Sequence, residues 1–133
     1  MSGTYTNLLF HVVYSTKYRK PLIKDDMKDR LYGYIGGIIR DEKGILLEVG
    51  GMPDHVHLLA KFSPRIAVSD MLRLIKTNSS KWMNEQDKIR RRFEWQTGYA
   101  AFSVSESQVD NVRRYLHDQI EHHAVTTFKD EYL

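Results

Sequence analysis

The feature that most constrains this chain is an alternation of residue types along residues 55–62, His-Val-His-Leu-Leu-Ala-Lys-Phe. Side chains alternate between the two faces of a β-strand. One face of this strand is wholly apolar and carries Val56, Leu58, Ala60 and Phe62. The other face carries His55, His57, Leu59 and Lys61. The apolar face is expected to cover a hydrophobic core, and the histidine face is expected to form the opposite surface of the sheet.

The segments around this strand alternate between strand and helix patterns. Strands are predicted over residues 7–14, 45–49, 55–62 and 93–104, with a hairpin turn at 50–54. Helices are predicted over 25–41, from Ser69 or Asp70 to about Gln86, and after the capping-box pattern of residues 105–108. This order predicts an α+β fold of the ferredoxin-like or RRM-like split βαβ type. Its antiparallel sheet has helices on one face, and the C-terminal helix is an addition.

Length and composition set the class of protein. The 133 residues predict a single domain over 1–133, which is long enough to bury a hydrophobic core without disulfides or structural zinc. The sequence has no cysteine, which excludes disulfide scaffolds, zinc ribbons and thiol nucleophiles. We find no secretory signal pattern and no apolar run long enough to span a bilayer, so we expect a cytoplasmic protein with no membrane partner.

Basic residues are concentrated in two places. Residues 65–92 contain eight Lys or Arg against three Asp or Glu, and residues 17–20 read Lys-Tyr-Arg-Lys. Together these two clusters could neutralise several phosphates of a nucleic acid. The alternative interpretation is an ordinary solvated surface.

Two further patterns carry chemistry. His55 and His57 lie on one face of their strand, about 7 Å apart at their Cα atoms, where both imidazoles could bind one metal ion or one phosphate. Two ordinary surface histidines are the alternative. Near the end of the chain, Tyr115 and Gln119 are four residues apart, so a helix would place them on the same side. A packed tyrosine without a chemical role is the alternative there.

Taken together, three segments resemble a known family. They are residues 10–22 (Phe-His-Val-Val-Tyr-Ser-Thr-Lys-Tyr-Arg-Lys-Pro-Leu), residues 51–59 (Gly-Met-Pro-Asp-His-Val-His-Leu-Leu) and the helix with Tyr115 and Gln119. They are similar to the HUH-type single-tyrosine transposases of the smallest insertion sequences, the TnpA type, in which two histidines flank a hydrophobic residue. The resemblance covers nearly the whole chain.

The resemblance implies a metal-dependent endonuclease and strand transferase that acts on single-stranded DNA. By position, His55 and His57 match the two metal-binding histidines, Gln119 the third metal ligand, and Tyr115 the nucleophile. Mg²⁺ or Mn²⁺ is the implied cofactor. Attack by the tyrosine would produce a 5′-phosphotyrosine and a free 3′-OH, and the retained bond would allow rejoining without ATP.

The resemblance also implies partners. The expected substrate is single-stranded DNA with a subterminal hairpin, and the expected assembly is a homodimer in which the tyrosine helix of one subunit completes the site of the other in trans. The segment 103–105 could act as the hinge for that exchange. Candidate DNA-binding residues are Lys17, Tyr18, Arg19, Lys20, Arg73, Lys76 and Lys81.

Two other readings stay open at this point. One is a domesticated relative that binds DNA hairpins without moving them, and the other is a non-catalytic nucleic-acid-binding module. Such a sheet-based binding module would present aromatic stacking residues on its exposed sheet face, where this chain has His55, His57 and Lys61. That difference favours catalysis.

Overall fold

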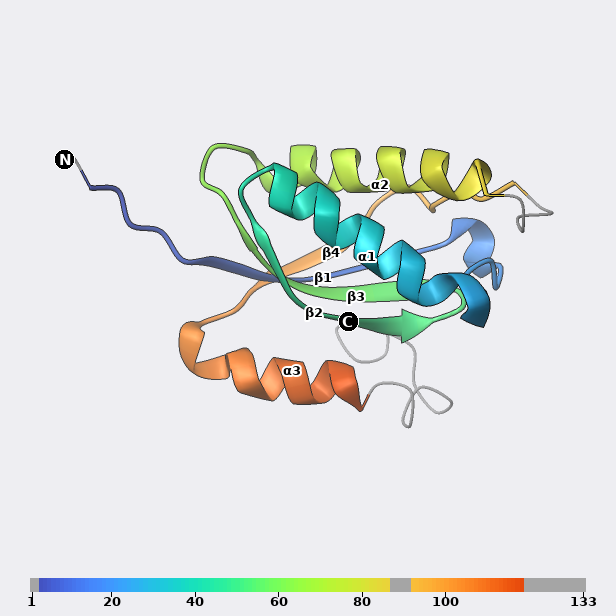
Figure 1. Cartoon of the computed structure of the whole chain (residues 1–133). Coiled ribbons are helices and arrows are strands. Elements are labelled where there is room, and N and C mark those ends of the chain that lie inside the picture. The colour runs from blue at the N-terminus through green and yellow to red at the C-terminus, as the bar shows by residue number, and fades with distance from the viewer. Residues whose placement is uncertain (1–2, 87–91, 119–133) are drawn as a thin grey trace.

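The computed structural model describes residues 3–86 and 92–118, which form one four-stranded sheet with three α-helices (Figure 1). The strands are β1 (Leu8–Ser15), β2 (Ile45–Met52), β3 (His55–Phe62) and β4 (Ala100–Ser103). Their order is β2-β3-β1-β4, and every neighbouring pair is antiparallel. β1 and β2 therefore run parallel with β3 between them, which is the split βαβ arrangement predicted from the sequence.

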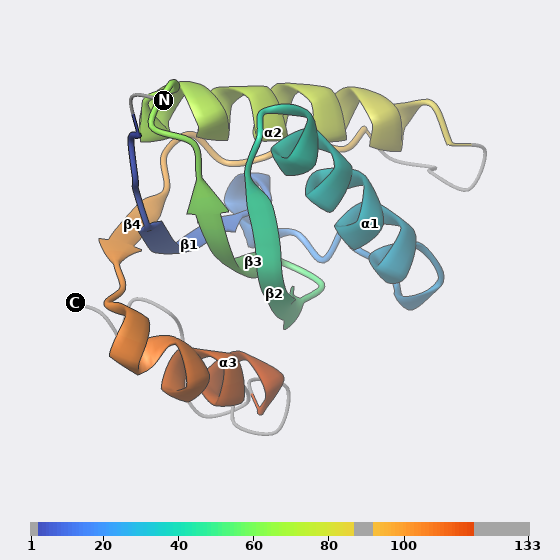
Figure 2. The same cartoon turned by 60° about the vertical axis from the view of Figure 1, so that its left-hand side comes forward.

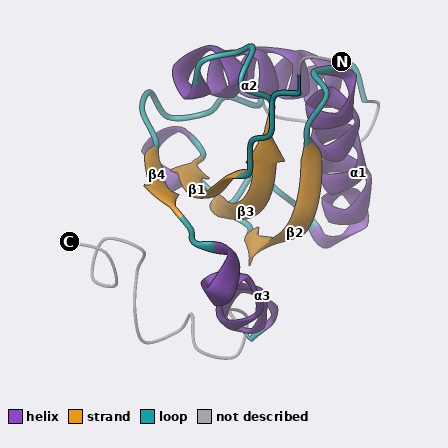
Figure 3. Cartoon of the chain, turned by 90° about the vertical axis from the view of Figure 1, so that its left-hand side faces the viewer, coloured by secondary structure: helices purple, strands orange, loops and turns teal. Residues whose placement is uncertain are grey.

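The helices lie on both sides of the sheet. α1 (Asp25–Asp41) and α2 (Val68–Asn84) cover one face, and α3 (Val109–His117) lies on the opposite face (Figures 2 and 3). A single 3₁₀ turn, Glu106–Gln108, precedes α3. Within the described ranges, no helix is long and apolar enough to cross a bilayer.

The hydrophobic core lies between the sheet and the α1–α2 layer. All four apolar residues predicted for one face of β3 are buried in it: Val56, Leu58, Ala60 and Phe62. α1 contributes side chains at helical spacing, Met27, Leu31, Ile35 and Ile39. The apolar stripe of α2 includes Met71 and Ile75, which are also buried. The predicted core face of the strand is confirmed.

The last strand and the helix caps differ from their predictions. β4 has four residues, because residues 92–99 follow an irregular path in which Trp95 forms an isolated bridge with Thr16 and Gly98 has a φ of 93°. Neither predicted cap forms: no side-chain hydrogen bond caps the described helix starts, and Asp70 lies inside the first turn of α2. The Ser105 hydroxyl contacts the Ser107 hydroxyl instead.

Candidate active site

The histidine face of β3 is buried, so the expectation that it forms the surface of the sheet is wrong. His55 and His57 are both fully inaccessible. The reason is α3, which packs directly over this face. The Leu116 carbonyl lies only 3.0 Å from where a Cβ on Gly50 would sit, and the Arg113 guanidinium donates to the Leu47 carbonyl at 3.0 Å.

α3 brings the predicted nucleophile to the predicted metal histidines within one chain. The half-buried Tyr115 ring lies 6.1 Å from the His57 ring, centroid to centroid, and His57 lies 5.1 Å from His55. Gln119, the third predicted ligand, lies outside the described residues. The structure therefore assembles three of the four predicted site residues.

Sequence reasoning missed His11 of β1. Its Nε2 lies 3.0 Å from Nδ1 of His57, and its ring stacks on that ring and meets the Tyr115 ring at 6.2 Å. Burial lowers the pKa of His11 to about 4, so its imidazole is neutral at neutral pH. The signal was present, because His11 alternates with the core residues Val12 and Tyr14 in a segment that was predicted to be a strand.

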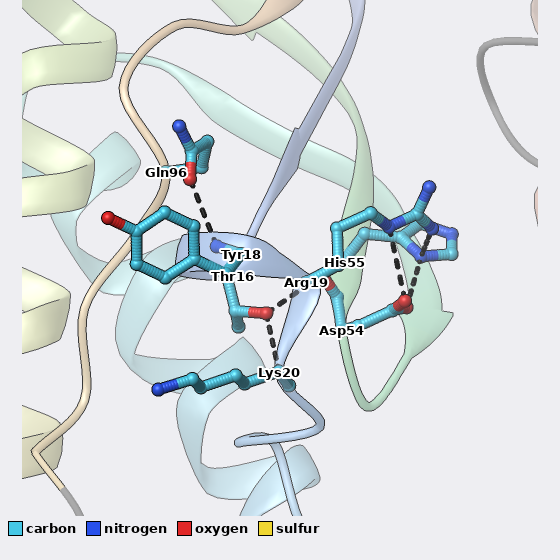
Figure 4. Close-up of polar contacts among 7 residues, drawn as sticks. All are labelled: Thr16, Tyr18, Arg19, Lys20, Asp54, His55 and Gln96. Carbon is cyan, nitrogen blue, oxygen red and sulfur yellow. Dashed lines mark hydrogen bonds and ion pairs between the residues drawn. The ribbon is translucent and has the colours of Figure 1, made fainter.

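His55 is linked to Asp54, which the sequence placed only in a turn. The Asp54 carboxylate lies 2.8 Å from Nδ1 of His55 through one oxygen and 3.2 Å from Nε of Arg19 through the other (Figure 4). Burial opposes ionisation of Asp54, but the hydrogen bond from His55 and the charge of Arg19 outweigh it. They hold the pKa of the Asp54 carboxyl below its usual value.

These contacts decide which atoms could bind a metal ion. The Nδ1 atoms of His55 and His57 contact Asp54 and His11, so the buried Nε2 atoms are the ones through which the rings would coordinate. Two imidazoles held in this way suit Mn²⁺ and other divalent ions that accept nitrogen ligands. Among the described residues, no three His, Cys, Asp or Glu side chains form a complete metal site. The two histidines fit a metal centre that takes further ligands from elsewhere.

Residues 17–20, predicted to contact DNA, form an exposed turn. Arg19 of this turn contacts one oxygen of Asp54, and His55 contacts the other. Tyr18 is 73% exposed, with the ammonium groups of Lys17 and Lys20 at 5.5 and 5.9 Å from its ring. Lys17 also forms an ion pair with Glu94 at 3.0 Å. Arg19 differs from its neighbours because its guanidinium faces Asp54. The turn thus presents one aromatic ring and two cations to solvent.

The three basic residues predicted on α2 line one cleft. A cleft of about 770 Å³ lies between α2 and residues 92–99, and Arg73, Lys76 and Lys81 are on its wall. Lys76 donates to the carbonyls of Gln96 and Gly98 at 2.6 and 2.8 Å, and burial lowers its pKa. Lys76 therefore connects the irregular segment 92–99 to α2. Lys81, by contrast, is exposed.

A split βαβ sheet, a histidine pair on one of its strands and a tyrosine on the C-terminal helix are the features that the sequence led us to expect of a single-tyrosine transposase. Residues 4–119 match the family model described as "Transposase IS200 like". The chain belongs to the IS200-like transposase family.

Individual relatives agree with this assignment. The chain is 25% identical over 122 residues to the ISDra2 transposase TnpA of Deinococcus radiodurans. The aligned region covers 88% of this chain and 87% of the relative. A crystal structure of a Deinococcus radiodurans R1 protein assigned as a transposase superposes with a TM-score of 0.68 at 26% identity, covering 90% of this chain and 95% of that one. A REP-associated tyrosine transposase bound to a REP hairpin shares the fold, with a TM-score of 0.64 at 16% identity and coverage of 94% and 76%.

Proposed function

We propose that this transposase cleaves and rejoins single-stranded DNA through a covalent 5′-phosphotyrosine on Tyr115. The observation that carries the proposal is the position of Tyr115, whose ring lies 6.1 Å from that of His57 in a site buried under α3. A cleft of about 660 Å³ between β4 and α3 reaches Tyr115 and is lined by Phe102, Gln108 and Asn111. That cleft gives a DNA strand access to the tyrosine.

In the proposed reaction, the Tyr115 oxygen attacks the phosphorus and the bond from phosphorus to the 3′-oxygen breaks. The phenolic proton is lost, and the departing 3′-oxygen gains a proton to become a 3′-OH. Rejoining reverses these steps with another 3′-OH, and phenolate leaves readily because its pKa of about 10 is far below that of an alcohol.

The proposed cofactor is Mg²⁺ or Mn²⁺, held by Nε2 of His55 and His57 and by Gln119. When bound, such an ion would polarise the phosphoryl oxygen and stabilise charge on the departing oxygen. The protein's own contribution is to hold the two imidazoles in fixed orientations through Asp54 and His11, and to exclude water with α3.

The proposed substrate is single-stranded DNA next to a subterminal hairpin. The solved relative bound to a REP hairpin, together with the basic cleft along α2 and the Lys17–Lys20 turn, supports this. Phosphates would contact Lys17, Lys20, Arg73 and Lys81, with Lys76 and Arg19 at the edges of the same surface, and Tyr18 could stack on a base.

We also infer a homodimer that exchanges α3 between subunits. In the single chain, Tyr115 lies beside its own His57, and only residues 104–105 separate β4 from the 3₁₀ turn that starts α3. A mixed dimer of His57→Ala and Tyr115→Phe subunits tests the exchange. Trans assembly restores one working site and about half of the adduct, whereas cis assembly restores none.

The test of the function is covalent capture. The protein is incubated with a labelled single-stranded oligonucleotide that carries its genomic flanking hairpin and Mn²⁺, and a denaturing gel is examined for a protein–DNA adduct. We expect an adduct that disappears in Tyr115→Phe and with EDTA. Hairpin binding that needs no metal and gives no adduct would contradict catalysis and would indicate a domesticated binding protein.

A further inference from the structure

Residues 16–20 form a turn that is strained at two consecutive positions. Tyr18 and Arg19 have φ values of 57° and 56°. A residue with a side chain adopts this left-handed region only at an energetic cost, because its Cβ comes too close to the following carbonyl oxygen. Several hydrogen bonds hold the turn: among them, the Thr16 hydroxyl donates to the Lys20 carbonyl at 2.6 Å, the Arg19 amide donates to the Thr16 carbonyl at 2.9 Å, and the Tyr18 amide donates to Gln96 Oε1 at 3.0 Å. An unfavourable backbone that is held so firmly points to a role for the side chains it directs.

The strained turn sends its two side chains to opposite sides. In Figure 4 the Tyr18 ring points away from the β2–β3 hairpin, while Arg19 extends toward Asp54 and His55. Arg19 reaches the Asp54 carboxylate at 3.2 Å, and the second oxygen of that carboxylate meets Nδ1 of His55 at 2.8 Å. One carboxylate therefore links the guanidinium to the imidazole.

This geometry fixes the proton on His55. An ionised carboxylate only accepts hydrogen bonds, so the 2.8 Å contact with Asp54 requires the proton to be on Nδ1. Nη2 of Arg19 lies farther from Nδ1, at 3.4 Å, and the carboxylate contact dominates. A neutral imidazole with its proton on Nδ1 has its lone pair on Nε2, the form that binds a metal ion through Nε2.

We propose that Arg19 and Asp54 together position the ring of His55. The strained turn of residues 16–20 directs Arg19 toward Asp54. Asp54 accepts a hydrogen bond from the Nδ1–H group of His55 and so fixes the plane of the ring, and Arg19 holds the carboxylate in place. The proposal rests on the metal-dependent function proposed above, because positioning of Nε2 matters only if a divalent cation binds there. It gives Arg19 a task other than the phosphate contact that its sequence position suggests.

The first experiment measures the proton on His55 directly. Nitrogen-15 NMR of the imidazole side chains, on the full-length protein without metal, distinguishes the Nδ1–H from the Nε2–H form. We expect Nδ1–H for His55 in the wild type and a shift toward Nε2–H in Asp54→Ala. If Asp54→Ala does not fold, Asp54→Asn replaces it, and we expect that variant to shift in the same direction by a smaller amount.

The second experiment measures binding of Mn²⁺ alone by electron paramagnetic resonance. We expect Asp54→Ala to raise the Kd about 10- to 100-fold, and Arg19→Gln to give a smaller increase. Asp70→Ala is the matched control, because it removes the carboxylate of another Asp–Arg pair, the exposed one with Arg73 on α2. It should change neither the His55 proton position nor the Mn²⁺ affinity.

The two readouts separate failure of this proposal from failure of the proposed function. A folded Asp54→Ala with unchanged His55 protonation and unchanged Mn²⁺ affinity overturns the positioning role and leaves the metal chemistry intact. A wild type that binds no Mn²⁺ overturns the metal chemistry, while a shift of the His55 proton in Asp54→Ala still upholds the contact that orients the ring.

Discussion

Both faces of the sheet are covered by helices, but the side chains buried on the two faces differ in chemistry. The face under α1 and α2 is a continuous apolar core in which Leu58 is fully inaccessible. The face under α3 is equally inaccessible at His57, yet it places the rings of His11, His55 and Tyr115 within 6.1 Å of the His57 ring, centroid to centroid. Burial on the first face stabilises the fold, whereas burial on the second also lowers the pKa of His11 and keeps its imidazole neutral. We therefore expect substitutions at neighbouring positions of β3 to have separable effects on stability and on activity.

The largest expected effect is that of His57→Ala on cleavage. Loss of one of the two proposed metal ligands should reduce adduct formation by more than about 100-fold. The free energy of unfolding should change by much less than the free-energy equivalent of the lost activity, because the truncation removes no part of the α1–α2 core. Adduct yield on a denaturing gel and a denaturant melt measure the two quantities. A variant that loses stability in proportion to its activity would contradict the separation of the faces.

Leu58→Ala is the converse change, one residue along the same strand. Truncation of this fully buried side chain should lower the free energy of unfolding by about 2–5 kcal/mol. The Mn²⁺ affinity of the folded fraction should stay within about twofold, because the side chain points away from the histidines. Urea titration measures the stability. A large loss of Mn²⁺ affinity in folded protein would show that the two faces are coupled.

Gly50→Ala is expected to disturb only the α3 side. A Cβ at this position would lie 3.0 Å from the Leu116 carbonyl and push α3 away from β2. A displacement of a few tenths of an ångström at this contact should slow adduct formation by roughly 10-fold or less, because a full 1 Å misplacement costs about 100-fold. Hydrogen exchange of the α3 amides should rise. Gly33→Ala in α1 is the control, since nothing lies within 4 Å of its Cβ, and it should stabilise the protein by roughly 1 kcal/mol without slowing cleavage.

The smallest expected effect belongs to the surface. Lys81→Ala should weaken hairpin binding several-fold and reduce the slope of log affinity against log salt by about 1, because a phosphate contact releases one counterion. Stability should not change measurably. Fluorescence anisotropy at several salt concentrations measures this slope. An unchanged slope would remove Lys81 from the DNA surface.

Much of the site was predictable because its chemistry follows local patterns. The alternation in residues 55–62 placed the two histidines on one face, and the helical spacing of α3 placed Tyr115 beside the stripe that contains Leu116. The burial of that histidine face was not predictable, because it depends on α3 crossing under the sheet. The contact of Arg19 with Asp54 was not predictable either, because the positive φ values of Tyr18 and Arg19 do not follow from their residue types.

The sequence by itself determined the order of elements and the core face of β3, and it supplied the candidates for the reactive residues. These depend on periodicity and on residue chemistry, which act over a few neighbouring positions. Only the tertiary structure decided which side chains meet. His11 on β1 contacts His57 on the neighbouring strand β3, and Arg19 contacts Asp54 over a separation of 35 residues. Such contacts follow from strand register and helix docking, which are set by the packing of the whole domain.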